Sequence, residues 1–139
     1  MDLHFKSAAE IARLIRQRKI SAVETLEHFL ARVEKYDPRL NAIVWLDVAQ
    51  ARKRAQAADA ALAKGEIWGP LHGVPMTIKE SYNVAGSPTT WGDPNLKNNI
   101  RKQAHSRLSG WKSPASCCSA RPTCRCCSPM ENCRDLTDQ

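Results

Sequence analysis

The sequence predicts an α/β fold for residues 1–100, followed by a tail at residues 101–139 that forms no packed domain. Two segments carry apolar residues at helical spacing behind a capping box, and two short apolar runs are typical of strands. The resulting order of helix, helix, strand, helix, loop and strand is that of the opening of an α/β domain. The tail follows neither periodicity, and we expect it to be disordered because its only Leu, Ile, Val, Met or Phe residues are Leu108, Met130 and Leu136.

The first predicted helix begins after Ser7, which lies three residues before Glu10. In this capping box the serine hydroxyl accepts a bond from a backbone N–H of the first turn, and the glutamate accepts one from the serine N–H. The apolar residues that follow, to about residue 19, are Ile11, Leu14 and Ile15. The sequence therefore predicts a short amphipathic helix.

The second predicted helix begins with the same kind of capping box, formed by Ser21 and Glu24. We expect Pro38 to end it, because proline lacks the N–H that a helix needs and its ring clashes with the preceding turn. The apolar stripe of this helix consists of Val23, Leu26, Phe29, Leu30 and Val33.

A strand and a third helix are predicted next. Residues 41–46 are short, apolar and partly β-branched, which favours a strand, although six residues also fit a helix entry. Residues 47–64 are rich in alanine and dotted with Arg and Lys, which predicts a helix with Gly65 as its C-cap.

Lys79 ends a second predicted strand, residues 76–79, directly after a loop dense in Gly and Pro at residues 67–75. A desolvated lysine at this position would favour its neutral amine and could act as a general base. A lysine at a strand end is more often solvated, however. From the residues alone both interpretations stay open.

Residues 69–80 spell Gly-Pro-Leu-His-Gly-Val-Pro-Met-Thr-Ile-Lys-Glu, a motif that resembles the lysine-bearing motif of the amidase signature family. Over about residues 5–100 the predicted elements are similar to that family's N-terminal region in order and spacing. The resemblance implies a mixed sheet and hydrolysis of small-molecule amides at the C–N bond by a Ser-Ser-Lys triad. It also implies that Lys79 is the triad's base, that His72 is structural, and that no metal or organic cofactor takes part.

The chain departs from the family in one respect. The Gly/Ser-rich segment that carries both serines in the family lies beyond the lysine, and nothing in this sequence matches it. Ser81 and Ser87 lie in the loop after Lys79, outside any such context. Because the members of a triad act as a unit, we expect a truncated amidase that is inactive alone.

The net charge of +7 is unevenly distributed. Residues 1–100 hold 14 Lys and Arg against 11 Asp and Glu, whereas the last 39 residues hold 7 against 3 and all six cysteines. The basic excess is therefore weak support for a nucleic-acid partner, and we expect none. The sequence has no apolar run long enough to span a membrane and no secretory signal at its start, so we expect no membrane partner and a cytoplasmic protein with reduced thiols. It specifies neither the amide substrate nor the oligomeric state.

The six tail cysteines allow a different interpretation, in which the chain is a small cytosolic interaction protein with a metal-binding tail. Only Cys124 and Cys127 form a C-x-x-C pair, and a second pair is absent, so we expect no metal site. The full set is Cys117, Cys118, Cys124, Cys126, Cys127 and Cys133.

A shifted reading frame explains the tail better. One choice of permitted codons for residues 105–119, read from their third base, gives Phe-Ala-Val-Glu-Arg-Leu-Glu-Ile-Ala-Gly-Ile-Val-Leu-Leu, an amphipathic helix that runs into an apolar strand. Those for residues 119–125 continue with Gly-Lys-Thr-Asn-Val-Pro, which resembles the strand and turn that follow the lysine motif in the amidase family. We therefore interpret the tail as a frame-shifted translation that begins near Ile100.

Overall fold

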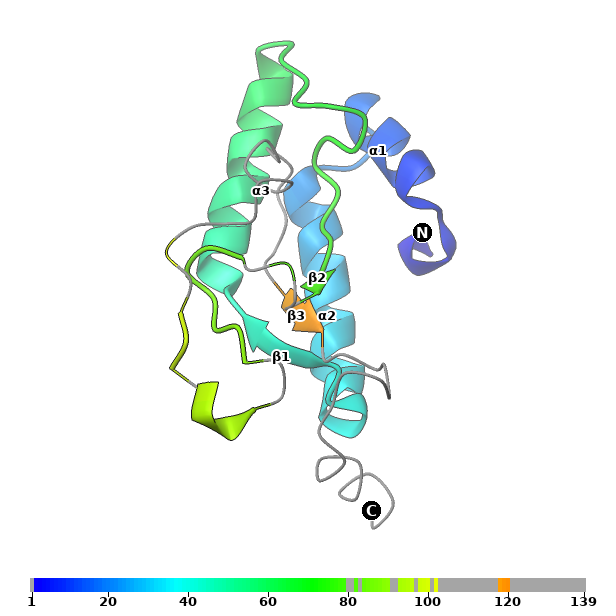
Figure 1. Ribbon diagram of the computed structural model, residues 1–139. Coiled ribbons are helices and arrows are strands. Elements are labelled where there is room, and N and C mark those ends of the chain that lie inside the picture. Colours follow the sequence, from blue (N-terminus) through cyan, green and yellow to red (C-terminus); the bar gives the residue numbers. More distant parts are fainter. Residues whose placement is uncertain are drawn as a thin grey trace.

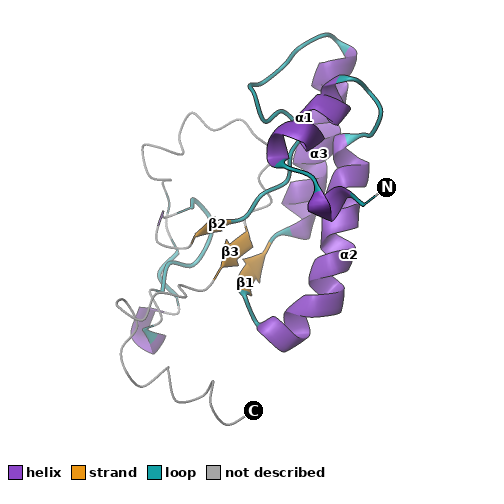
Figure 2. Cartoon of the chain, turned by 90° about the vertical axis from the view of Figure 1, so that its right-hand side faces the viewer, coloured by secondary structure: helices purple, strands orange, loops and turns teal. Residues whose placement is uncertain are grey.

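The computed structural model describes residues 2–79, 82, 84–90, 93–96, 98–100, 102 and 118–120. Three helices pack together on one side of the molecule, and a small sheet lies beside them (Figures 1 and 2). The helices and strands appear in the order predicted from the sequence, which confirms the α/β class. In chain order the elements are η1 (Leu3–Phe5), α1 (Ala8–Arg16), α2 (Ala22–Leu40), β1 (Ile43–Leu46), α3 (Val48–Ala63), β2 (Ile78–Lys79), η3 (Pro94–Leu96) and β3 (Cys118–Ala120).

Both predicted capping boxes are confirmed. At the start of α1 the Ser7 hydroxyl accepts a bond from the Glu10 N–H at 3.3 Å, and the Glu10 carboxylate accepts one from the Ser7 N–H at 2.9 Å. Ser21 and Glu24 form the same pair of bonds at 2.9 and 2.8 Å at the start of α2. The first turns of both helices are therefore fixed by residues that the sequence itself identifies.

The predicted end of the second helix at Pro38 is wrong, because α2 continues to Leu40 with the proline inside its last turn. Only two helical residues follow Pro38, so its missing N–H and its ring disturb a single turn. Hydrogen bonds to Asp37 then fix the path of the chain as it leaves the helix. Its carbonyl accepts a bond from Asn41, which is left-handed at φ 47°, and its carboxylate accepts bonds from the N–H groups of Ala42 and Ile43 at 2.9 and 3.1 Å.

Helix α3 matches its predicted range closely. Asp47 is the N-cap, and Gly65, at φ 81°, lies one residue beyond the C-cap. The Gly65 N–H bonds to the Leu62 carbonyl at 3.0 Å, and the Glu66 N–H bonds to the Ala61 carbonyl at 2.9 Å. This pair of bonds is a Schellman motif, which explains why a glycine follows the helix.

The sheet has the order β1-β3-β2, with β3 antiparallel to β1 and parallel to β2. Strand β1 lies within the predicted strand at residues 41–46, and β2 forms the last two residues of the one predicted at 76–79. Strand β3 comes from the tail and was not predicted. Five of the six cysteines, all but Cys118, lie outside the described residues.

The core consists of two clusters between the helices. One joins α1, α3 and the loop before β2, through Ile15, Leu62 and Val74. The other joins α2 to α3 mostly through small side chains, namely Ala22, Leu26, Ala51, Ala55 and Ala58. Alanines at this interface let the two helices approach closely. Within the described residues, no helix is both long and apolar enough to cross a bilayer.

Candidate functional site

Lys79 is the last residue of β2, and its backbone pairs with that of Ala120 in β3. Strand β2 is at the edge of the described sheet, and the lysine side chain is exposed. The described residues therefore position the backbone of Lys79 without enclosing its amine. This exposure within the described residues fits the solvated interpretation, and the catalytic role of Lys79 stays a prediction.

The loop before β2 is held against the helices by its backbone. Arg16 of α1 donates a bond from its guanidinium to the Pro70 carbonyl at 2.7 Å. The His72 N–H bonds to the Gly69 carbonyl, and the Val74 N–H bonds to the Leu71 carbonyl, both at 3.2 Å. These hydrogen bonds fix the path of the chain between the end of α3 and strand β2, which ends at Lys79.

Gly73 lies where this loop packs against the start of α2 and against Ile15 of α1. Its φ is 78°, a left-handed conformation that favours glycine. A Cβ atom at this position would lie 3.0 Å from Ile15 Cγ2 and 3.1 Å from the Ala22 Cβ. The glycine is thus required both by its conformation and by the space between α1 and α2.

His72 is structural, as the resemblance implies. Its side chain is 1% exposed. Nδ1 accepts a bond from the Trp68 N–H, and Nε2 lies 3.1 Å from the Ala58 carbonyl of α3, both within the fold. Because Nδ1 is an acceptor, the proton is on Nε2, which donates to that carbonyl. Both ring nitrogens are used to join the loop to α3, and neither is left for catalysis.

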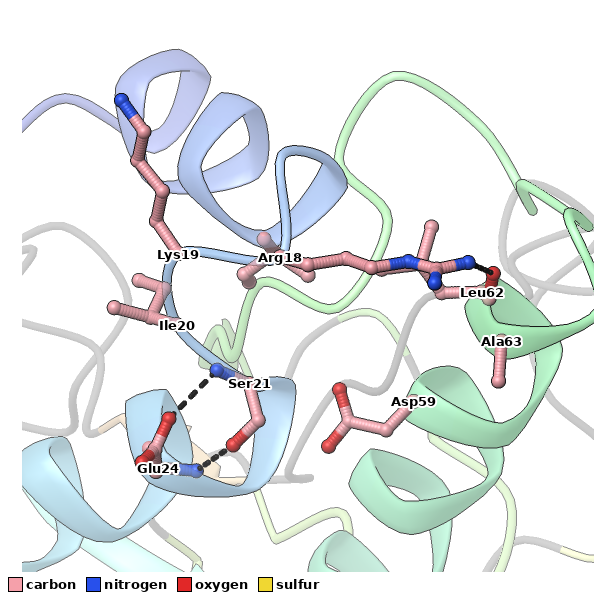
Figure 3. A pocket seen from close by; sticks show the side chains of 9 residues that line it. Arg18, Lys19, Ile20, Ser21, Glu24, Asp59, Leu62 and Ala63 are labelled. Carbon is pink, nitrogen blue, oxygen red and sulfur yellow. Dashed lines mark hydrogen bonds between the residues drawn. The ribbon is translucent and has the colours of Figure 1, made fainter.

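An open pocket of about 460 Å³ lies where the turn between α1 and α2 meets the end of α3. Figure 3 shows two of its charged side chains in hydrogen bonds, Glu24 with Ser21 and Arg18 with the Leu62 carbonyl. The Asp59 carboxylate accepts bonds from the N–H groups of Ala22 and Val23 at 2.7 and 3.1 Å, and Arg18 donates to the Leu62 carbonyl. Lys79 does not line this pocket, so we interpret the pocket as a helix junction. Its lining residues are Ile15, Arg18, Lys19, Ile20, Ser21, Glu24, Asp59, Leu62 and Ala63.

Two electrostatic interactions involve helices α2 and α3. The backbone N–H of Ser21, and then its hydroxyl, hold the pKa of the Glu24 carboxyl below its ordinary value of 4.5. Glu27 of α2 accepts two bonds from the Arg52 guanidinium of α3, at 2.6 and 2.9 Å, and this contact lowers the pKa of the glutamate. Because the pair is exposed, its contribution to stability is small.

In the loop after β2, the described serine is Ser87. Ser87 is buried, and its hydroxyl donates to the Val84 carbonyl at 2.9 Å, so this side chain stabilises the turn at residues 84–87. Thr89 pairs through its backbone with Asn99, and its buried hydroxyl has no hydrogen-bond partner within the described part. No sequence pattern identified this threonine. Ser81 lies outside the described residues.

The described residues contain no group of three or more His, Cys, Asp or Glu side chains that could hold a metal ion. The site they present is therefore one lysine at a strand end, supported by a Gly/Pro loop that is bonded to the helices.

Comparison with known proteins gives consistent matches. The family model described as Amidase matches residues 24–108. A glutamyl-tRNA(Gln) amidotransferase subunit of Bdellovibrio bacteriovorus is 46% identical over 98 residues, which are 70% of this chain and 20% of that protein. Indoleacetamide hydrolase of Bradyrhizobium diazoefficiens is 48% identical over 94 residues, which are 68% of this chain and 18% of that protein. The chain thus spans about a fifth of the length of the curated relatives it matches.

Solved structures agree with these matches. A bacterial aryl acylamidase of the amidase signature enzymes family superposes with a TM-score of 0.73 at 30% identity, over 87% of this chain and 26% of its own. Fatty acid amide hydrolase superposes with a TM-score of 0.74 at 27% identity, over 83% of this chain and 21% of its own.

Proposed function

The chain belongs to the amidase family, and from this premise we propose that residues 1–100 are the lysine-bearing part of a domain that hydrolyses amide C–N bonds. The observation that carries the proposal is the motif at residues 69–80, which lies inside the matched region and carries a lysine on a strand terminus. The relatives include an indoleacetamide hydrolase and an acylamidase. We therefore propose small organic amides as the substrate class.

In the proposed mechanism Lys79 is the terminal base of a Ser-Ser-Lys relay. Its neutral amine takes the proton of a bridging serine, which takes the proton of the serine that attacks the amide carbon. Backbone N–H groups then stabilise the oxyanion. The contribution of this chain is the placement of Lys79: the loop at residues 69–74 is bonded to the helices and fixes the start of β2. The proposal includes no metal or organic cofactor and places the reaction in the cytoplasm.

Neither triad serine has a counterpart in the sequence, so we propose that the 139-residue chain is inactive alone. Purified chain incubated with indole-3-acetamide should release no ammonia above the rate of a buffer blank. Hydrolysis that is present in this chain and lost in Lys79→Ala would overturn this proposal.

A chimaera tests the role of Lys79 directly. Residues 24–100 would replace the matched segment of the Bradyrhizobium indoleacetamide hydrolase, and the chimaera should hydrolyse its amide. Lys79→Met should lower kcat by about 10²-fold or more, because general-base catalysis contributes on this order. Lys64→Met, at the exposed C-cap of α3, is the matched control and should leave kcat unchanged. A chimaera that keeps its kcat without Lys79 would contradict the assignment.

For residues 101–139 we propose a frame-shifted translation of amidase sequence. In the shifted frame the apolar run Ile-Val-Leu-Leu falls at positions 115–118, beside the observed strand Cys118–Ala120. A strand at this point of the tail supports the proposal, since the tail's own residues predict none. The DNA sequence of the gene tests it: the shifted frame should encode an amidase-like peptide. A gene with no such peptide would contradict it.

A further inference from the structure

We draw no further inference here: the strongest candidate, the stacked side-chain pair of His4 in η1 and His28 in α2, with ring centroids 5.7 Å apart and with His4 Nδ1 and His28 Nε2 buried and lacking a hydrogen-bond partner within the described residues, carries no binding site, because the described part of the chain adds no third His, Cys, Asp or Glu that could hold a metal ion with them.

Discussion

Gly73→Ala tests whether the lysine loop depends on its close approach to the helices. The substitution leaves the chemistry of the motif intact and adds one methyl group. That methyl group would lie 3.0 and 3.2 Å from two carbons of Ile15, and 3.1 Å from the Ala22 Cβ. These contacts are shorter than the ordinary van der Waals range, and two of the three elements involved are helices that cannot move independently of the core.

Two costs add at this position. An alanine held at φ 78° costs about 1 kcal/mol relative to glycine. Overpacking against Ile15 and Ala22 costs about 1–3 kcal/mol more. Gly65→Ala is the matched control, because φ there is 81° and no described atom lies within 4 Å of the added Cβ. It should carry only the conformational cost of about 1 kcal/mol.

The assay is urea unfolding of the 139-residue chain followed by circular dichroism at the helical band. Gly73→Ala should lower the free energy of unfolding by about 2–4 kcal/mol, the sum of the two costs. The excess over Gly65→Ala measures the packing contribution alone. Equal losses of unfolding free energy in the two variants would refute the close packing of the loop. The requirement for glycine at position 73 would then come from its backbone conformation alone.

Three further outcomes follow from bonds described above. Asp59→Ala should destabilise the chain by about 1–2 kcal/mol in the same unfolding assay, because the Ala22 N–H and its neighbour lose their acceptor, and Asp59→Asn should cost less. His72→Phe should cost about 2–4 kcal/mol by leaving one donor and one acceptor buried and unpaired, and a loss below about 1 kcal/mol would contradict the bridging role. The pKa values of Glu10 and Glu24 are lowered by the capping boxes, chiefly by the serine N–H groups, so each contributes stability above pH 4.5 that is lost as the pH falls through its folded value. Thermal unfolding from about pH 7 to about pH 3 should show this loss, and Ser21→Ala should reduce its amplitude.

Local signals made the helical part predictable. Ser7, Ser21 and Gly65 mark helix ends by bonds to residues three or four positions away, so the information lies in a short stretch of sequence. Pro38 misled the prediction because its effect depends on how many helical residues follow it. The side chain of Asp37 then determines where the chain leaves the helix, through bonds to residues that have no helical pattern.

The candidate site was predictable only in part. The motif around Lys79 identified the lysine and the Gly/Pro loop, and the structure shows which contacts hold that loop. The residues alone favoured a solvated amine at a strand end, but the burial of an edge strand depends on neighbours that are distant in the sequence and could not be derived from the motif. Strand β3 was missed for the same reason: Cys118, Ser119 and Ala120 have little intrinsic preference for a strand, and their place is determined by β1 and β2.

The β1-β3-β2 arrangement implies an order of folding for the chain. Leu46 pairs with Cys118, so closing the sheet requires bringing together positions that are separated by about half of the polypeptide. Contacts among α1, α2 and α3 are much more local and form faster. On the ribosome, the helices and the loop that carries Lys79 would be assembled before β3 has been synthesised. The strand that carries Lys79 would therefore be oriented by Gly73 and His72 before β3 is available to pair with it.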